Sequence, residues 1–371
     1  MYGAQLIEAL RRRQPSAEFF GAGGERMRAA GCDTVVDAAD LSVVGITEIL
    51  SHLPKIYFRY RQLIRAADRR LPDLAVVIDS PAFNWRIARQ MHKRGIPVVY
   101  YVCPQFWAWR QKRVRLLQNY IAKALVIFPF EEDFYREHGV DATFVGHPLA
   151  DLPRPSVTRE EYGERYRLNL AKDWIILMPG SRVKEIQMNL PGILESATLL
   201  GAKYEYLLPV APTMDPEFIR RAIGGSIAIR LVPEALPALW HSRAGIIASG
   251  TATVEAAMMA TPFVMVYRVS PLTYRLGRPR VKVSHFAMVN LIAGEEVVPE
   301  LVQDNFTAEQ VVARMQEILP YGPARDKMEA GLARVRGLLR GPTQGEHALH
   351  PADRAADVIL GLIGRPRVVS L

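Results

Sequence analysis

Cysteine is scarce in this sequence, and long apolar runs are missing from it. The two cysteines, Cys32 and Cys103, supply neither a disulfide framework nor the spacing of a metal site. No apolar run approaches the roughly 18 residues that span a bilayer, and no signal peptide opens the sequence. We therefore expect a protein of the reducing cytoplasm.

Acidic residues are also fewer than basic residues. The 47 lysines and arginines exceed the 38 aspartates and glutamates, which gives a formal net charge of +9. This balance favours an anionic partner: nucleic acid, a phospholipid surface or a phosphorylated substrate. Neither zinc-finger spacing nor an aromatic RNP-type motif is present, so we do not expect nucleic acid. Charge leaves the other two partners open.

Short apolar runs alternate with helix-compatible segments along the 371 residues, a length that favours two domains. In the first half, the pattern predicts a helix at 2–13 with no strand before it, strands at 17–20, 74–78, 98–102, 124–128 and 143–145, and helices at 25–30, 53–70, 81–94 and 131–138. In the second half, it predicts strands near 175–178, 204–209, 227–231, 245–248 and 263–267, and helices over 308–340 and 352–362. This alternation predicts parallel sheets with helices on both faces.

The stretch 148–173 is rich in proline and charge, and we expect the interdomain linker there. We predict a Rossmann-like domain over 1–165, a second one over 166–345, and a C-terminal helix and tail over 346–371 that pack back on the first domain or on a partner. The helix at 53–70 mixes apolar and basic residues. Such a helix is typical of anionic membrane surfaces, and equally of a surface helix with one face on a core.

Two apolar runs each end at a glycine-containing turn that precedes a helix-compatible segment. The turns are Pro179-Gly180-Ser181, with Arg182 next, and Ser249-Gly250-Thr251. At such a strand-to-helix turn, free backbone N–H groups and the positive end of the helix dipole bind phosphate, and Arg182 adds a guanidinium. Two such turns in one half of the chain predict a diphosphate-bearing ligand.

Simple helix capping is the alternative for both turns. Glu185 follows Ser181 by four residues, and Glu255 follows Thr251 by four, whereas a capping box needs a spacing of three. We therefore favour nucleotide binding. With two parallel-sheet domains, this predicts the GT-B architecture, in which a cleft separates an acceptor-binding first domain from a donor-binding second domain.

Several motifs, in order and spacing, resemble the lipid-A-disaccharide synthase family. They are Ile78-Asp-Ser-Pro-Ala-Phe-Asn84, Pro104-Gln-Phe-Trp-Ala-Trp-Arg110 with Arg113, Gly146-His-Pro-Leu149, Pro179-Gly-Ser-Arg182 with Glu185, Ser249-Gly-Thr-Ala-Thr253 with Glu255, and Asn290-Leu-Ile-Ala-Gly294 with Val298-Pro-Glu-Leu301. The similarity covers nearly the whole chain, and its tryptophan-rich block is its most specific part.

The resemblance implies an inverting GT-B transferase that uses neither a metal nor another cofactor. Its donor is UDP-2,3-diacylglucosamine, and its acceptor is the 6-hydroxyl of 2,3-diacylglucosamine 1-phosphate, called lipid X. The products are a β-1,6 tetraacyl disaccharide 1-phosphate and UDP. Such enzymes are cytoplasmic and associate peripherally with the inner-membrane surface, and we expect a monomer or a homodimer.

Asp79 is the candidate general base, because it follows a predicted buried strand at its carboxyl end, where α/β folds bind ligands. Ser80 is the better N-cap for the next helix, which frees Asp79 from that role. We expect Arg182 and the helix after Ser249 to stabilise the leaving diphosphate. Glu255 is expected to contact the ribose, with a solvated glutamate on the helix face as the alternative. The resemblance makes Asn290 a third catalytic candidate, which either hydrogen-bonds a substrate in the cleft or serves only to form a turn.

The expected UDP-binding residues are Gly180, Ser181, Arg182, Glu185, Ser249, Gly250, Thr251, Thr253 and Glu255. Other residues keep two interpretations. Trp107 and Trp109 suit a sugar or acyl platform, although buried core aromatics are more common. His147 suits a structural hydrogen bond better than a base. The basic run Arg275, Arg278, Arg280 and Lys282 suits the acceptor phosphate, lipid head groups or a solvated loop.

The sequence departs from the family pattern in two places. The family begins with a strand and a glycine-rich GEASGD loop, whereas Met1-Tyr2-Gly3-Ala4 joins the pattern just after them. We expect that strand to lie centrally in the N-terminal sheet, so its lack would expose strand edges and leave the chain poorly active or unstable. Ala82 stands where the family often has an acidic residue, which leaves Asp79 as the only carboxylate of its block.

Two rival functions share parts of this pattern. Another GT-B enzyme of UDP-sugars, such as a peptidoglycan glycosyltransferase or a UDP-N-acetylglucosamine epimerase, would have the same diphosphate turns without an acyl-binding surface. A non-catalytic nucleotide-binding or membrane-binding protein would fit the positive charge.

Overall fold

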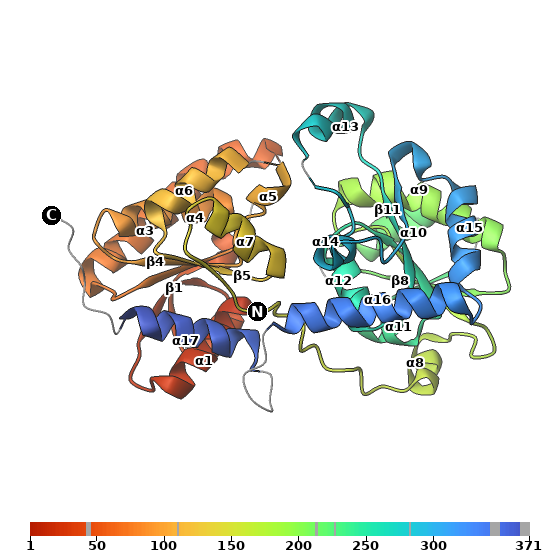
Figure 1. Cartoon of the computed structure of the whole chain (residues 1–371), viewed down its shortest axis with the longest axis horizontal. Coiled ribbons are helices and arrows are strands. Elements are labelled where there is room, and N and C mark those ends of the chain that lie inside the picture. The colour runs from red at the N-terminus through yellow and green to blue at the C-terminus, as the bar shows by residue number, and fades with distance from the viewer. Residues whose placement is uncertain are drawn as a thin grey trace. The chain divides into compact units, whose positions relative to one another are not determined.

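The protein is described from a computed structural model, which covers residues 1–41, 46–109, 111–211, 214–225, 228–281, 283–341 and 349–363, with the backbone alone at 46–53 and at 280. It is an α/β protein with two compact units (Figure 1). Unit 1 comprises Met1–Pro148 and Arg340–Leu371, and unit 2 comprises Leu149–Leu339.

The described residues of unit 1 form six parallel strands in two sheets. Its strands are β1 (Phe19–Gly23), β2 (Cys32–Asp37), β3 (Ala75–Ile78), β4 (Val98–Tyr101), β5 (Lys123–Val126) and β6 (Ala142–Phe144). Its helices are α1 (Tyr2–Arg13), α2 (Glu25–Ala29), α3 (Ile46–Arg70), α4 (Pro81–His92), α5 (Phe106–Trp109), α6 (Val114–Tyr120), α7 (Pro129–Glu137) and α17 (Pro351–Ile363), with short 3-10 turns at Ala38–Leu41 and Gln111–Arg113. The first sheet pairs β1 with β2, and the second has the order β3-β4-β5-β6.

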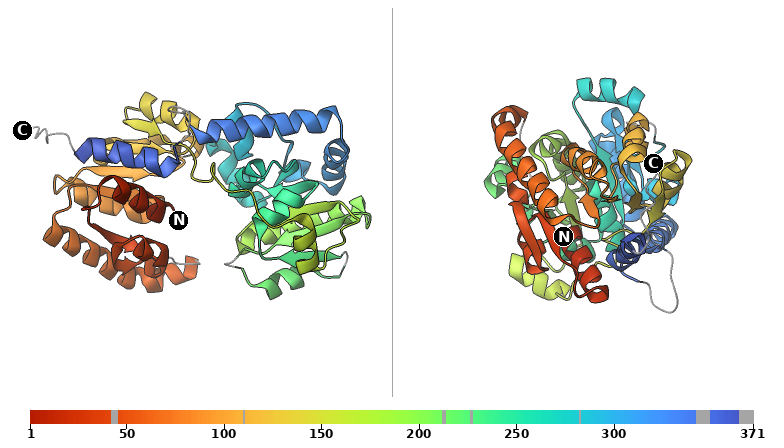
Figure 2. Two further views of the ribbon diagram at one scale, coloured as in Figure 1. Left: turned by 90° about the horizontal axis from the view of Figure 1, so that it is seen from below. Right: turned by 90° about the vertical axis from the view of Figure 1, so that its left-hand side faces the viewer.

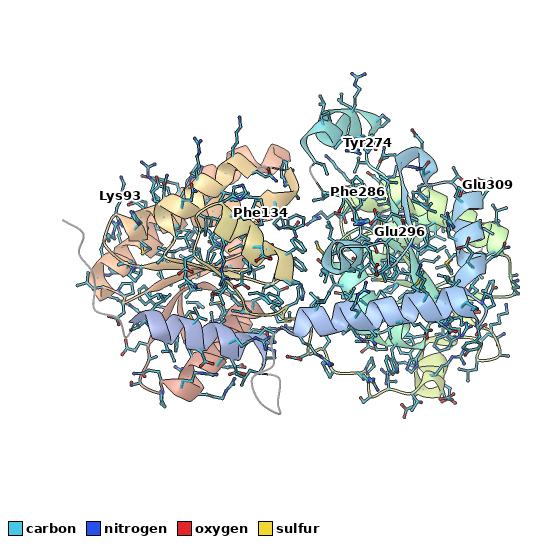
Figure 3. The ribbon with its side chains drawn as sticks, in the orientation of Figure 1. Lys93, Phe134, Tyr274, Phe286, Glu296 and Glu309 are labelled. Carbon is cyan, nitrogen blue, oxygen red and sulfur yellow. The ribbon has the colours of Figure 1, made fainter. Side chains whose placement is uncertain are left out.

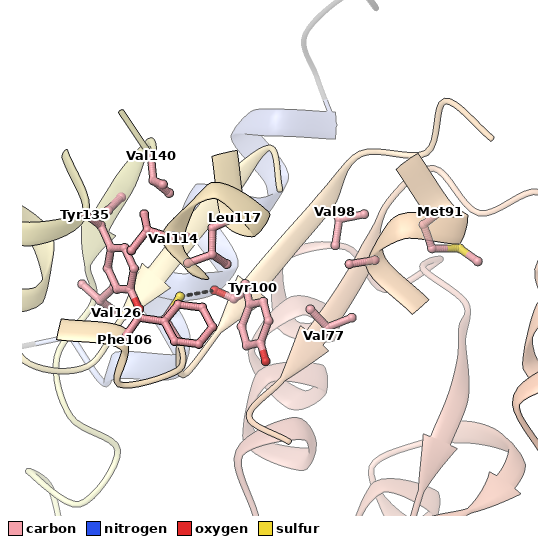
Figure 4. Packing of buried hydrophobic residues seen from close by; sticks show 14 of the residues in the cluster. Val77, Met91, Val98, Tyr100, Phe106, Val114, Leu117, Val126, Tyr135 and Val140 are labelled. Carbon is pink, nitrogen blue, oxygen red and sulfur yellow. Dashed lines mark hydrogen bonds between the residues drawn. The ribbon is translucent and has the colours of Figure 1, made fainter. Parts of the chain in front are cut away.

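The core of unit 1 lies where the second sheet meets its helices. Val77, Val98 and Tyr100 from the sheet pack with Leu117 of α6 and Tyr135 of α7 (Figure 4). β4 is buried at every position, which explains why its all-apolar sequence could be recognised as a strand covered on both faces.

The C-terminal helix α17 packs against α1, the first helix of the chain, as the views in Figure 2 show. Arg12 and Arg13 each contact Asp353 at 2.7 Å, and Arg13 Nε lies 2.5 Å from Asp357 Oδ1. The arginines in the last turn of α1 also lie at the negative end of its helix dipole, which is favourable for cations. Residues 340–371 therefore belong to unit 1, although the linear sequence places them after unit 2.

The strand that the family pattern places ahead of residue 2 stays a prediction. Within the described residues of unit 1, β1 with β2 and β3 to β6 form separate sheets. The first turn of α1 packs against parts of unit 1 that belong to both sheets. A Cβ atom added to Gly3 would lie 2.8 Å from Met27 Sδ of α2, which follows β1, and 3.4 Å from Ile78 Cδ1 of β3.

In unit 2, the residues that the structure describes form one parallel sheet of six strands. They are β7 (Trp174–Met178), β8 (Glu205–Pro209), β9 (Ile229–Val232), β10 (Ala244–Ala248), β11 (Phe263–Tyr267) and β12 (Glu300–Val302). Its helices are α8 (Arg159–Tyr166), α9 (Val183–Leu200), α10 (Pro216–Ile223), α11 (Ala235–His241), α12 (Thr251–Met258), α13 (Pro271–Gly277), α14 (Met288–Ala293), α15 (Ala308–Ile318) and α16 (Pro323–Arg340), with 3-10 turns at Arg278–Arg280 and Gln303–Asn305.

The strand order of this sheet is β12-β11-β10-β7-β8-β9. From β7 the chain proceeds outward through β8 to β9, then returns to β10 on the other side of β7 and proceeds outward again. The direction of winding therefore reverses between β7 and β10, and such a switch point is where open α/β sheets bind ligands.

Most predicted elements are present, with shifted ends, but the helices α5, α6 and α8 were not predicted, and α8 lies within the stretch 148–173 where we expected the linker. The strand expected at 17–20 begins at Phe19 and continues through Gly23. The strands β2 and β12 were not predicted: in β2 only Cys32 and Val36 are buried, and β12 has three residues, so neither makes a distinct apolar run. The unit boundary falls at 148/149 instead of 165/166, since Tyr162 of α8 donates to the Glu234 carbonyl of unit 2.

Candidate functional site

The carboxyl ends of β3 and β4 in unit 1 hold three residues in the left-handed region of backbone space. Asp79 and Ser80 have φ angles of 47° and 41°, and Val102 has a φ of 59°. This region is unfavourable for any non-glycine residue and most of all for a β-branched one. Strain of this kind concentrates at functional sites, where the surrounding structure holds it in place.

Asp79 is fixed through its backbone and leaves its carboxylate exposed. Its N–H donates to the Tyr101 carbonyl at 3.1 Å. Its own carbonyl accepts from Tyr100 Oη at 2.8 Å and from Asn84 Nδ2 at 2.6 Å. Across the described ranges, no side chain or backbone group hydrogen-bonds the Asp79 carboxylate, so this acceptor remains available for a ligand.

Ser80 occupies the N-cap position of α4 without a side-chain capping bond. The expectation that its hydroxyl caps the helix is therefore wrong, because the left-handed backbone turns the residue away from the usual extended capping geometry. Asn84 of α4 fixes the turn in another way: its Nδ2 donates to the Ile78 carbonyl at 2.8 Å as well as to the Asp79 carbonyl.

The tryptophan-rich block divides into a buried and an exposed part. Trp107 is 6% exposed and its Nε1 donates to Glu131 Oε1 at 2.8 Å, whereas Trp109 is 49% exposed. Tyr135 Oη donates to the Pro104 carbonyl, so α7 holds the block by two side chains. Trp107 is thus a core residue. Arg110 lies outside the described residues.

Glu131 was not predicted as a site residue, although it is fully buried at the start of α7. It accepts from Trp107 and from the N–H groups of Ile127 and Phe128, at 3.2 and 3.1 Å. Burial nevertheless raises the pKa of its carboxyl to about 7.

Burial also lowers the pKa of His147 to about 4, which keeps that imidazole neutral at physiological pH and fits a structural residue.

In unit 2, the first predicted turn lies at the carboxyl end of β7. Gly180 has a φ of 124°, which only glycine adopts without strain. Asn189 of α9 fixes the turn by donating to the Pro179 carbonyl at 3.2 Å and accepting from the Arg268 N–H at 2.8 Å. The Arg182 side chain is 80% exposed at the N-cap position of α9.

Glu185 caps this turn, contrary to the spacing argument. Its Oε2 accepts from the N–H groups of Ser181 at 3.0 Å and Arg182 at 3.3 Å, and its Oε1 lies 2.5 Å from Arg182 Nη1. The N-cap is Arg182 and not Ser181, so the spacing to Glu185 is three after all. The N–H groups expected to be free for phosphate are therefore already bonded to a carboxylate.

The second turn lies at the carboxyl end of β10, beside the first, because β10 and β7 are paired. Gly250 has a φ of 145° and precedes α12, whose first residue, Thr251, is exposed. Ser249 Oγ donates to the Phe286 carbonyl at 2.8 Å, and Thr253 Oγ1 donates to the Gly250 carbonyl at 2.7 Å. These two hydroxyls shape the turn, while Thr251 faces solvent.

Glu255 is mostly buried in α12, and burial alone raises the pKa of its carboxyl. No group in the part of the chain that the structure describes donates a hydrogen bond to its side chain. A desolvated carboxylate without a donor destabilises the folded protein. Such a group is expected where a ligand, and not the fold, supplies the hydrogen bonds.

In the structure, Asn290 is hydrogen-bonded by the fold, whereas we expected it to contact a substrate. It is fully buried, and its Nδ2 donates to the Val298 carbonyl at 2.9 Å and to Glu300 Oε1 at 2.8 Å. Its Oδ1 accepts from the N–H groups of Val297 at 2.8 Å and Val298 at 3.0 Å. The prediction that Asn290 hydrogen-bonds a substrate is corrected, since four bonds saturate the amide.

Glu300 is the partner through which Asn290 acts, and sequence analysis missed it. Its carboxylate also accepts from the N–H groups of Phe286 at 2.8 Å and Ala287 at 2.9 Å. The ring of Phe286, labelled in Figure 3, stacks on Tyr267 with centroids 6.2 Å apart. Asn290 and Glu300 thus fix the segment that carries the Phe286 carbonyl, the acceptor for Ser249. The only hint in the sequence was the Val298-Pro-Glu-Leu301 block.

Two features of the described residues bear on membrane and metal chemistry. No helix there is long and apolar enough to cross a bilayer. No group of three or more histidine, cysteine, aspartate or glutamate side chains is placed to hold a metal ion in those same ranges.

Replacement of Asn290 by alanine should destabilise unit 2. It leaves the N–H groups of Val297, which is partly buried, and Val298, which is buried, without an acceptor, at about 1–3 kcal/mol each. We expect the free energy of unfolding, measured by denaturant titration, to fall by about 2–4 kcal/mol. An Asn290→Ala protein with unchanged stability but lost activity would contradict the structural role and favour direct contact with substrate.

Comparison with known proteins identifies the family. The family model for lipid-A-disaccharide synthetase matches residues 1–337. A lipid-A-disaccharide synthase of Koribacter versatilis is 52% identical over 369 residues, covering 98% of this chain and 96% of that protein. The enzyme of the same name from Acidobacterium capsulatum is 48% identical, covering 97% and 93%.

Solved structures show the fold. The glycotransferase of kitacinnamycin has a TM-score of 0.62 at 16% identity, covering 97% of this chain and 95% of that one. The calicheamicin glycosyltransferase CalG4 has a TM-score of 0.59 at 16% identity, covering 99% and 95%. These are GT-B glycosyltransferases, and the two parallel-sheet units have the same architecture. This chain belongs to the lipid-A-disaccharide synthase family.

Proposed function

We propose that this protein transfers 2,3-diacylglucosamine from UDP to the 6-hydroxyl of 2,3-diacylglucosamine 1-phosphate, with inversion at the anomeric carbon. Family membership supports the reaction class. The observation that carries the donor assignment is the position of the Gly180 and Gly250 turns, which end the neighbouring strands β7 and β10 where the strand order reverses.

Unit 2 binds the UDP part of the donor in this proposal. The exposed guanidinium of Arg182 and the N-terminus of α12 supply positive charge for the pyrophosphate. Glu185 moves its carboxylate off the Ser181 and Arg182 N–H groups when the anion enters, or it keeps the turn in shape while Arg182 alone contacts the phosphate. Glu255 accepts hydrogen bonds from the ribose hydroxyls, which would satisfy its buried carboxylate.

Unit 1 supplies the base. The acceptor hydroxyl loses its proton as its oxygen attacks the anomeric carbon and the bond to the UDP oxygen breaks. The Asp79 carboxylate takes this proton, since it is exposed, held by a strained backbone and not engaged by the fold. Negative charge that develops on UDP is stabilised by Arg182 and the α12 N-terminus, so the proposal includes no metal ion.

We place the protein in the cytoplasm, peripherally on the inner membrane, where both acylated substrates reside. Two helices support this. Tyr57 and Phe58 of α3 are about 60% exposed beside Arg61. On α13, Leu272 and Leu276 are 62% and 53% exposed beside Arg275. Exposed apolar side chains flanked by arginines suit the interface of an anionic bilayer.

Replacement of Asp79 by alanine should abolish the base without loss of donor binding. We expect kcat for disaccharide formation to fall by roughly 100- to 10,000-fold, with the Kd for UDP unchanged, as measured by UDP release and by calorimetry. Asp73→Ala, at an exposed position before the same strand, is the matched control and should keep full activity. A full transfer rate in the Asp79→Ala protein would exclude Asp79 as the base.

Replacement of Glu255 by glutamine should stabilise the protein and weaken UDP binding. Because burial raises the pKa of Glu255, the folded state binds this proton more tightly, and stability is lost as pH rises through that pKa. The Tm of the Glu255→Gln protein should therefore equal the wild-type Tm at acidic pH and exceed it at neutral pH. We expect UDP affinity to fall about tenfold. Equal Tm values at neutral pH, or unchanged affinity, would contradict this role.

Replacement of Leu272 and Leu276 by serine should weaken membrane binding. We expect the partition coefficient onto phosphatidylglycerol vesicles, measured by co-sedimentation, to fall by about tenfold or more. The double variant Leu199→Ser, Leu338→Ser removes exposed leucines elsewhere in unit 2 and should bind as the wild type does. Equal loss in both variants would show that general surface apolarity, and not α13, causes binding.

A further inference from the structure

A basic cavity lies at the amino ends of β7 and β10, at the opposite edge of the unit 2 sheet from the two turns. Its volume is about 350 Å³, and its lining includes Arg159, Arg243 and Arg325, together with His241 and Asp173. Arg243 directly precedes β10, and its N–H donates to the carbonyl of Trp174, the first residue of β7, at 2.8 Å. The cavity is therefore separate from the donor site.

Arg243 presents a fixed guanidinium to this cavity. Its Nε donates to the Leu319 carbonyl at 2.7 Å, and its Cζ lies 3.7 Å from the centroid of the Tyr321 ring. Neither of its terminal nitrogens has an acceptor among the residues that the structure describes. Because Nε and the ring face orient this guanidinium, its two terminal nitrogens remain available for a bidentate contact with a phosphate or carboxylate group.

Arg325 adds a second positive charge at close range. It is 7% exposed, and its Nη1 donates to the carbonyls of Arg243 at 3.0 Å and Ile318 at 2.9 Å. Its pKa is lowered, first by burial and next by the charge of Arg243. Glu329 contacts Arg325 Nε at 2.7 Å, and its side chain is 43% exposed. The pair of arginines thus carries more positive charge than its surroundings neutralise.

Arg159 completes the basic wall. Its Cζ lies 4.2 Å from the Trp174 ring centroid, and its terminal nitrogens donate to the carbonyls of Leu170 and Lys172. Arg159 begins α8, which follows the passage of the chain from unit 1 into unit 2, and Arg325 lies on α16, after which the chain re-enters unit 1. The cavity is therefore built by the first and last segments of unit 2 around the start of its central strands.

We propose that this cavity is a second anion site, which binds a small phosphate-bearing molecule through the fork of Arg243 with Arg325 and Arg159 around it. Binding offsets the mutual repulsion of the arginines. The phosphate group comes either from free phosphate in the cytoplasm or from the head group of a lipid. The proposal does not depend on the transferase reaction.

Calorimetric titration tests this proposal at constant ionic strength, with chloride replaced by inorganic phosphate. Saturation of the wild type with UDP removes the donor turns from the readout, and a second series uses the Arg182→Ala protein, in which the Arg182 contact is lost. We expect one saturable phosphate site in both series, and a loss of affinity of about tenfold or more with Arg243→Gln. A soluble short-chain phosphatidic acid, titrated in parallel, shows by its relative affinity which source of phosphate the cavity prefers.

Two further variants make the result decisive. Arg243→Lys keeps the charge but not the fork, so it should fold and bind phosphate more weakly than the wild type. Arg221→Gln removes an exposed arginine of α10 outside the cavity and should leave phosphate binding unchanged. The proposal is overturned if phosphate gives no saturable heat beyond the chloride control, or if the folded Arg243 variants bind it as tightly as the wild type.

Discussion

The reversal of strand order between β7 and β10 is the constraint on which the rest of this structure depends. Parallel pairing aligns the carboxyl ends of the two strands, so their glycine turns become neighbours although about 70 residues of chain separate Gly180 from Gly250. Two helices then start side by side. In the proposed function, a pyrophosphate binds where these two helices begin.

The polar residues near the carboxyl ends of the strands differ in whether the folded protein satisfies their hydrogen-bonding groups. Asn290, Glu300 and Glu131 have their hydrogen-bonding groups engaged by backbone N–H groups or by other side chains, and they hold segments in place. Asp79 and Glu255 make no such bonds in the described structure. Burial without a donor costs stability at Glu255. That cost is what we expect of a residue whose partner is a ligand.

Positive charge is distributed over several distinct surfaces instead of forming one patch. Arg12 and Arg13 pair with acidic residues of α17 and stabilise unit 1. Arg182 and Arg275 are exposed near glycine turns or leucines, where phosphate and lipid head groups are the expected partners. Arg243 and Arg325 face a cavity at the other end of the sheet. The basic side chains therefore divide between ion pairs inside unit 1 and exposed or cavity-lining positions in unit 2.

The sequence by itself determined the alternation of strands and helices, the two glycine turns and the family, because these depend on local patterns and on motif order. Only the tertiary structure decided which polar groups are already satisfied. It showed that Glu185 caps its own turn, that four hydrogen bonds saturate Asn290, and that residues 340–371 return to unit 1. Hydrogen-bond partners far apart in the chain, such as Trp107 and Glu131, are brought together by packing, and no local pattern encodes their distance.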